Sequence, residues 1–150
     1  RVWGTYYGGN NDDRGREVDL DHNGNIVMCG YTQSDSGIAT PDAFKTFFSP
    51  GYDSTGTLTN DAFLVKFDSN GHRIWGTYFG DYLTETARGL AINSNDDLFI
   101  AGTTFDPAHI AYGNSYQSQL GGVSDLFFAN AITSSKSFIR TKGSPPLNCI

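Results

Sequence analysis

The residues best suited to chemistry in this chain are acidic and amide side chains that gather next to glycine. Asp19, Asp21 and Asn23 stand at the spacing of the first half of a calcium-binding loop, and Gly24 follows them. In such a loop, side-chain oxygens converge on a hard cation. The twelfth loop position would be Gly30, where a bidentate glutamate is needed, and Asp, Asn and Gly also favour hairpin turns. The stretch therefore predicts either a Ca²⁺ site or a plain hairpin turn.

A second candidate is an aromatic platform on a loop. Residues 46–60 are rich in Ser, Thr and Gly, which is typical of a surface loop that tolerates changes in length. Phe48 and Tyr52 lie within this stretch. Because flat rings offer apolar area, and tyrosine adds a polar tip, Phe48 and Tyr52 are candidate glycan-binding residues. Most aromatic residues in a small β-unit belong to the core, so packing within the fold is the competing interpretation.

Catalytic roles are the third possibility for the acidic residues. Glu17, Asp19 and Asp21 alternate along one predicted strand, and paired carboxylates serve as acid and base in glycosidases. However, alternate positions on any strand are about 7 Å apart, so three polar strand residues always have this spacing. The three histidines have no HExxH partner and no GxSxG nucleophile motif nearby. The sequence therefore predicts a protein that is not an enzyme.

These residues are arranged by a tandem repeat. Trp3-Gly4-Thr5-Tyr6 returns as Trp75-Gly76-Thr77-Tyr78, and the two copies then stay in step without a gap as far as Thr32 and Thr104. Later in the chain, Asp61-Ala62-Phe63 meets Asp125-Leu126-Phe127 at a shorter offset. The first copy therefore contains an eight-residue insertion, within residues 46–60. A repeat of this kind predicts stacked copies of one small structural unit.

The repeated unit is predicted to be built of β-strands. Short apolar runs, 18 glycines and the lack of apolar residues at helical spacing favour strands and tight turns, so the fold class is all-β. Val18 and Leu20 alternate with acidic residues, so we expect one buried face on their strand. Cys29 aligns with Ala101, which predicts a small buried side chain. The expected strands are Val2–Tyr7, Arg16–Asp21, Ile26–Thr32, Ala62–Phe67, Arg73–Phe79, Arg88–Asn93, Leu98–Thr104 and Leu126–Ala131.

Bulk properties exclude several classes of partner. A formal net charge of −6 and a pI near 4.7 argue against nucleic acid, which needs clustered Lys and Arg. No run of about 18 apolar residues exists, so we expect no membrane insertion. The chain of 150 residues is 38% hydrophobic, which is enough to build one core.

A resemblance to a known family rests on stretches whose order and spacing match its repeat, over roughly residues 1–131. In the first copy these are residues 3–9, 18–26, 30–32, 42–44 and 60–67, and in the second copy residues 113–117 and 121–127. These stretches resemble the bacterial SBBP β-propeller repeat. The resemblance implies one four-stranded antiparallel blade per repeat, in a large secreted or cell-surface bacterial protein. It also implies a scaffold or binding surface without a catalytic residue set.

The organisation that follows has four parts. Residues 1–13 are the outer strand of a preceding blade with its turn, and residues 14–81 are the first blade. Residues 82–131 are a second blade that lacks its last strand. Residues 132–150 match neither repeat and are expected to be poorly ordered. Because propellers close with about four to eight blades, two blades leave an open edge.

The function predicted from the sequence is a non-catalytic structural or binding module outside the cell or on its surface. The alternatives are a glycan-binding or carbohydrate-active protein that uses the propeller loops, and a calcium-stabilised adhesion module. Expected partners are another protein or a glycan, together with neighbouring blades of a longer protein or self-association. No cofactor is predicted, with Ca²⁺ as the one alternative.

Overall fold

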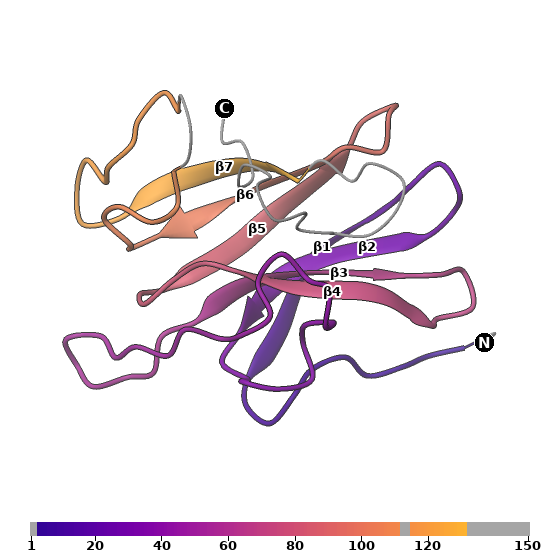
Figure 1. Cartoon of the computed structure of the whole chain (residues 1–150), viewed down its shortest axis with the longest axis horizontal. Helices are drawn as coiled ribbons and strands as arrows, with labels where there is room; N and C mark the ends of the chain where they lie inside the picture. Colours follow the sequence, from indigo (N-terminus) through magenta and orange to yellow (C-terminus); the bar gives the residue numbers. More distant parts are fainter. Residues whose placement is uncertain (1–2, 112–114, 132–150) are drawn as a thin grey trace.

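The structure is a computed structural model that describes residues 3–111 and 115–131 as two antiparallel β-sheets (Figure 1). The strand order is β1-β2-β3-β4 in the first sheet and β5-β6-β7 in the second. Within these residues, no helix is long and apolar enough to cross a membrane. The predicted all-β class of one four-stranded and one incomplete unit is confirmed. The strands are β1 (Asp13–Leu20), β2 (Ile26–Thr32), β3 (Asp61–Phe67), β4 (Arg73–Phe79), β5 (Glu85–Ile92), β6 (Leu98–Thr104) and β7 (Asp125–Ala131).

The first strand of each sheet begins earlier than predicted, at Asp13 and at Glu85. The strand register shifts around Arg16 in β1 and around Arg88 in β5, which marks a β-bulge at each place. A bulge inserts one extra residue and breaks the alternation of side chains between the two faces. The pattern of polar and apolar residues therefore did not reveal that pairing continues on the N-terminal side.

The short acidic and amide stretches form hairpin turns. Asp21 Oδ1 accepts the backbone amides of Asn23 and Asn25, at 2.9 and 2.8 Å. Asn93 accepts two amides in the same way in the β5–β6 turn, and so does Asp68 in the β3–β4 turn. Such side chains satisfy turn amides that the sheets leave unpaired. The hairpin interpretation of this stretch is therefore confirmed.

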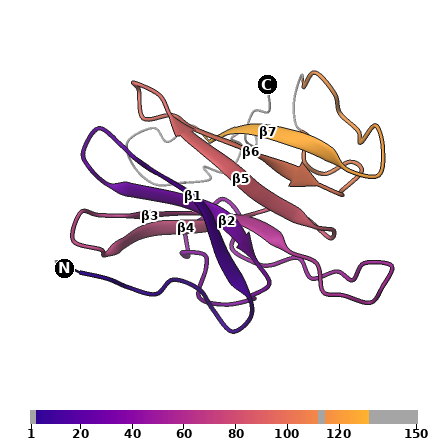
Figure 2. The same ribbon diagram turned by 180° about the vertical axis from the view of Figure 1, so that it is seen from behind.

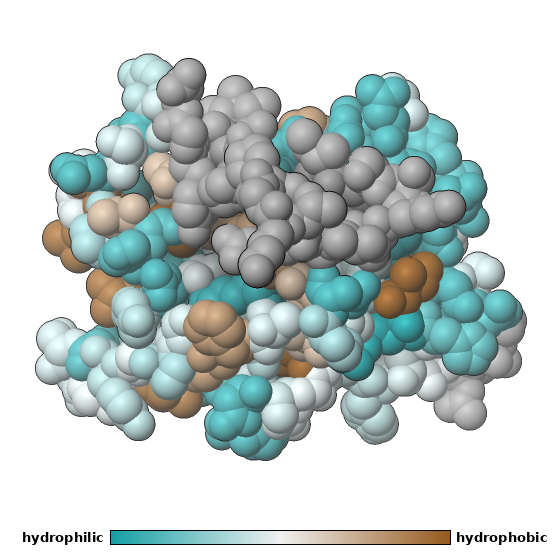
Figure 3. All heavy atoms as spheres, in the orientation of Figure 1, coloured by the Kyte–Doolittle hydropathy of each residue, from teal (hydrophilic) through white to brown (hydrophobic). Residues whose placement is uncertain are grey.

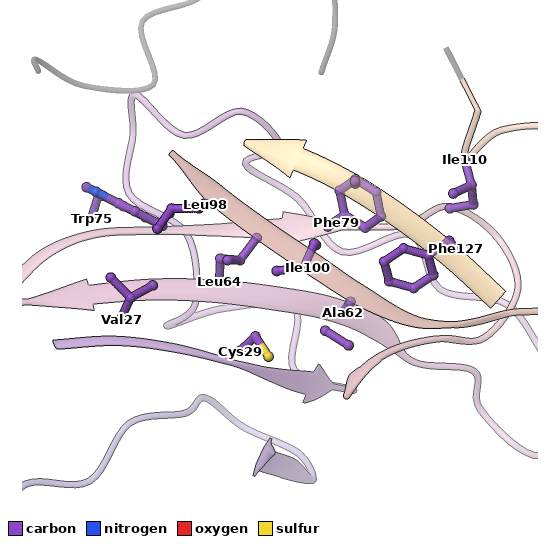
Figure 4. Close-up of a cluster of buried hydrophobic side chains, with 12 residues drawn as sticks. Val27, Cys29, Ala62, Leu64, Trp75, Phe79, Leu98, Ile100, Ile110 and Phe127 are labelled. Carbon is purple, nitrogen blue, oxygen red and sulfur yellow. The ribbon is translucent and has the colours of Figure 1, made fainter. Parts of the chain in front are cut away.

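The two sheets pack face to face, with β5 crossing β1, β2 and β3 (Figures 1 and 2). Their facing apolar side chains form one core (Figure 4). Cys29 is fully buried in it, as predicted from its match with Ala101. Other members are Val27, Ala62 and Leu64 of the first sheet and Leu98, Ile100 and Phe127 of the second.

A second core covers the opposite face of the first sheet. Ile38 and Phe48, from the segment that links β2 to β3, pack there with Phe63, Val65 and other side chains. The Tyr7 ring adds to this core, since its centroid lies 5.4 Å from that of Phe63. The long link and the N-terminal segment therefore cover this face of the first sheet, as the second sheet covers the other face.

The expected burial of Val18 and Leu20 is wrong. These side chains are 56% and 59% exposed, although they lie on an apolar face. Their counterparts in the second sheet, Leu90 and Ile92, pack against the first sheet. Among the described residues, β5 packs on the opposite face of β1, and no sheet packs on the face that carries Val18 and Leu20. The greater exposure of Val18 and Leu20 therefore results from the missing neighbour and not from the strand itself.

The predicted outer strand at Val2–Tyr7 is not formed over its described part, residues 3–7. The segment is extended and held by side chains: Trp3 Nε1 donates to the Ser69 carbonyl at 2.9 Å, and the Tyr7 hydroxyl donates to the Ile38 carbonyl at 2.8 Å. A strand requires a paired neighbour, and the described residues place none beside this segment. The tail expected to be poorly ordered, residues 132–150, lies outside the described residues.

Candidate functional site

A group of ionisable side chains lies where the chain passes from β4 to β5. Glu85, the first residue of β5, is fully buried. Its Oε2 accepts the Asp81 amide at 2.9 Å, and its Oε1 accepts the Thr104 hydroxyl at 2.8 Å. Burial raises the pKa of Glu85 to about 8, against the opposing effect of these hydrogen bonds. The carboxyl group is therefore largely protonated at neutral pH.

This burial predicts a pH dependence that Glu85→Gln should reduce. The pKa of the folded state, about 8, lies above the ordinary value of 4.5. The resulting stabilisation is thus fully present below about pH 4.5 and is lost as the pH rises through about 8. We expect the melting temperature to fall across this interval in the unmodified chain and to fall less in Glu85→Gln. Circular-dichroism melts measure this, with Glu17→Gln on exposed β1 as the matched control. The same change of melting temperature with pH in all three proteins would contradict the prediction.

A buried ion pair stands beside Glu85. Lys45 Nζ lies 2.7 Å from Asp61 Oδ2 and also donates to the Gly80 carbonyl at 2.7 Å. Asp61 is fully buried, and its Oδ1 has no hydrogen-bond partner. Burial raises the pKa of Asp61 to about 6, and Lys45 opposes this rise. Asp61 is therefore largely ionised at neutral pH, and its ion pair holds Lys45 next to the start of β3.

The second repeat contains the same arrangement with an uncharged partner. Asp125, the counterpart of Asp61, accepts the Gln117 side-chain amide at 2.8 Å and the Gly121 backbone amide at 2.7 Å. Gln117 is the counterpart of Lys45 when the copies are aligned on their tryptophans. The aspartate at the start of the third strand thus fastens the preceding link in both repeats. The sequence alignment paired these residues, but it gave no sign of their contact.

Glu85 also has a counterpart in the first repeat. Asp13 Oδ2 accepts the Gly9 amide at 2.8 Å, just as Glu85 accepts the Asp81 amide. Asp13 Oδ1 accepts the Thr32 hydroxyl, which is equivalent to the bond from Thr104 to Glu85. Sequence reasoning missed both carboxylates because it began these strands too late in the chain. The alignment of the two copies, which pairs Asp13 with Glu85, was the signal that could have found them.

Three further side chains in this region could hold a divalent cation. The ligand atoms of Asp81, Asp106 and His109 all lie within 4.8 Å of one another. His109 Nδ1 is 2.8 Å from Asp106 Oδ1 and 3.8 Å from Asp81 Oδ2. Asp106 Oδ1 already accepts the backbone amides of Ala108 and His109, which makes it a turn-forming aspartate. The cluster borders a cavity of about 450 Å³ that Lys45 also lines.

The residues predicted to bind Ca²⁺ occupy the β1–β2 turn. Asp21 Oδ2 lies 2.6 Å from Lys66 Nζ and accepts the Asn25 side chain at 2.8 Å. Burial tends to raise the pKa of Asp21, but the hydrogen bonds from Lys66 and Asn25 outweigh it and lower the pKa to about 2. Asn23 is in the same turn, and Asp19 lies on β1, two residues before Asp21. A Ca²⁺ ion at Asp19, Asp21 and Asn23 stays a prediction, and it would have to displace Lys66.

The two predicted glycan-binding rings are placed differently. Phe48 is only 7% exposed, and its ring centroid lies 6.3 Å from that of Tyr78. Tyr52 is 70% exposed on the loop. Phe48 therefore belongs to the core, and Tyr52 alone is presented to solvent. On the face shown in Figure 3, hydrophobic residues form separate patches among polar ones.

A larger cavity of about 590 Å³ lies beside β7. Its lining comes from β7 itself, from the end of β6 and from the segment that links the two strands. The lining includes Thr104, Asp106, Ile110, Leu120 and Phe127.

No family model matches this chain, so the resemblance to the bacterial SBBP repeat is not confirmed. A curated protein is similar over 126 residues, at 26% identity: an uncharacterized WD repeat-containing protein of Acanthamoeba polyphaga mimivirus. The match covers 77% of this chain and 9% of that protein. Two antiparallel sheets built from a tandem repeat, together with this distant relative, indicate a propeller-type repeat protein.

Proposed function

We propose that this chain is a non-catalytic repeat module that binds another protein and works outside the cell or on its surface. The observation that carries this proposal is that carboxylates at equivalent positions of the two repeats make equivalent hydrogen bonds. Asp61 and Asp125 fasten equivalent links, and Asp13 and Glu85 hold equivalent strand starts. Groups that recur in this way serve the repeat architecture, so the raised pKa values of Asp61 and Glu85 need no catalytic role.

The distant relative supports a scaffold, since it too is named for a repeat. The glycan-binding alternative loses one of its two rings to the core, because Phe48 packs against Tyr78. The cluster of Asp81, Asp106 and His109 is the strongest opposing feature, because it could support metal-dependent chemistry. Its counterparts in the first repeat are Gly9, Ser34 and Gly37, so the cluster is not a property of the repeat.

The test uses the protein in the cells that produce it. Chemical cross-linking followed by fractionation is expected to link the module to another protein in the medium or at the cell surface. The double variant Asp81→Asn with His109→Gln should keep that link, since both side chains are partly or largely exposed. If the protein turns over a substrate and the folded double variant does not, the non-catalytic proposal is contradicted. Recovery only from the cytoplasm would contradict the proposed location.

A further inference from the structure

Among the residues that the structure describes, one edge of the second sheet is open. Within the described residues, β7 pairs with β6 alone, whereas its counterpart β3 pairs with both β2 and β4. In the first sheet, Phe63 lies opposite Tyr78 and Leu64 opposite Thr77. An unpaired edge presents a row of free amides and carbonyls that can pair with another strand. The equivalent positions on β7 are Phe127 and Phe128.

The cavity beside β7 lies where a tyrosine packs in the first repeat. Tyr78 of β4 is buried, and its hydroxyl donates to the Ser34 carbonyl at 2.8 Å. Its ring packs with Phe48 and belongs to the same core as Ile38 and Phe63. The counterparts of Ser34, Phe48, Ile38 and Phe63 in the second repeat are the cavity-lining Asp106, Leu120, Ile110 and Phe127. The cavity is thus the counterpart of the Tyr78 site.

The chain itself contains an unpaired segment with the sequence that fits this site. Trp3-Gly4-Thr5-Tyr6 is identical to Trp75-Gly76-Thr77-Tyr78 of β4. It forms no strand, and the Tyr6 side chain is fully exposed. In both views this segment lies on the far side of the first sheet from β7 (Figures 1 and 2). The segment of one chain therefore cannot reach β7 of the same chain while Tyr7 remains packed.

We propose that Trp3–Tyr7 of one copy of this chain pairs with β7 of a second copy and places Tyr6 in the cavity beside β7. The pairing is antiparallel, with Tyr6 opposite Phe127 and Thr5 opposite Phe128, as Tyr78 and Thr77 stand in the first sheet. Backbone hydrogen bonds supply the affinity of such strand addition, and the side-chain site sets the register. The contact is head to tail, so it repeats from copy to copy until a ring closes.

The position of Tyr7 shows that the segment already stands where an added blade needs it. The Tyr7 ring lies 5.4 Å from Phe63, and the ring of its counterpart Phe79 lies 5.2 Å from Phe127. Tyr7 therefore meets the first sheet as Phe79 of β4 meets the second. A second sheet from another copy that pairs with this segment would lie against β1.

The same docking covers both exposed apolar faces. Leu126 and Phe128 are exposed, whereas their counterparts Ala62 and Leu64 are buried between the sheets. On β1, Val18 is exposed where its counterpart Leu90 packs against a sheet. The sheet-to-sheet contact within one chain thus provides the template for the contact between chains.

Light scattering on a sizing column tests the assembly with the full chain. We expect a discrete oligomer and, in Tyr6→Ala, a dissociation constant raised about tenfold or more, as for a central anchor residue. Val18→Lys should weaken the same contact, and the exposed Tyr52→Ala is the matched control that should not. Because Tyr6 and Val18 are exposed, both variants should fold. A monomeric chain, or an oligomer that Tyr6→Ala leaves intact, would overturn the inference.

A disulfide test fixes the register. Residues directly opposite in an antiparallel pair have Cα atoms about 4.5–5.5 Å apart, within the range of a disulfide. Thr5→Cys mixed with Phe128→Cys, each with Cys149→Ser, should yield a cross-linked pair of chains under mild oxidation. Tyr52→Cys mixed with Phe128→Cys is the control and should not. An oligomer without the first cross-link would overturn the proposed pairing. A monomer that still binds a partner protein would overturn this inference alone and leave the proposed function standing.

Discussion

Replacing Gly102 with alanine is expected to lower the free energy of unfolding by about 3 kcal/mol or more, as for the severe end of overpacking. A Cβ at Gly102 would overlap the Thr86 carbonyl oxygen and lie 2.8 Å from the Phe127 ring. The obstacle includes main chain of β5, so a rotamer change cannot relieve it. Gly30 meets the same obstacle in the first repeat, from Arg14 and Phe63. A residue without a side chain is therefore required twice by the same geometry.

Gly89→Ala provides the matched control, because it lies in the same sheet and a Cβ there would meet nothing within 4 Å. We expect it to change the stability by no more than about 0.5 kcal/mol. Urea unfolding of both variants, followed by circular dichroism, measures the difference. Similar midpoints for Gly102→Ala and Gly89→Ala would show that the strand contact at Gly102 is not as tight as the structure describes.

Gly30 and Gly102 also illustrate how much of the fold could be predicted from the sequence. Matching the two copies paired Gly30 with Gly102 and located the returning strands, because β-branched and aromatic runs between turn residues are local signals. The bulges at Arg16 and Arg88 are not local, since they depend on how β1 and β5 register with their neighbours. The approach of the Arg14 and Thr86 carbonyls to these glycines depends on the same register and could therefore not be foreseen.

The candidate site was predictable to a smaller extent. The turn around Asp21 follows from Asp, Asn and Gly at fixed spacing, and the structure forms it. The Lys66 ion pair that occupies the same carboxylate requires the register of β3 beside β2, which no spacing rule supplies. Glu85 lay between two predicted strands and was assigned to neither, so its burial was not expected.

The missing neighbours explain the remaining errors. Val18 and Leu20 carry the pattern of a buried face, and residues 3–7 carry that of a strand. Both patterns describe a repeat within an array, in which each sheet is covered on two sides. The described residues form two units, and among them the same side chains are exposed and residues 3–7 are unpaired. The pattern was therefore interpreted correctly for the unit and incorrectly for its surroundings.

Phe48→Ala is expected to destabilise the fold by about 3–5 kcal/mol, as other large aromatic deletions in cores do. Phe48 is only 7% exposed and packs against Tyr78 in the core that covers the first sheet. That core connects the long link to β3 and β4, so the cavity would open beneath the link. The link has few other apolar anchors to close it, chiefly Ile38 and Leu58.

Tyr52→Ala is the control on the same loop, and its stability should change by about 0.5 kcal/mol or less because the side chain is 70% exposed. Thermal melts and retention on immobilised glycans, measured on both variants, separate the two interpretations of this loop. If Phe48 is a core residue, its replacement lowers the melting temperature, whatever happens to glycan retention. An unchanged melting temperature with lost retention would instead place Phe48 on the surface as a binding residue. That outcome would contradict the packing of the link against β4.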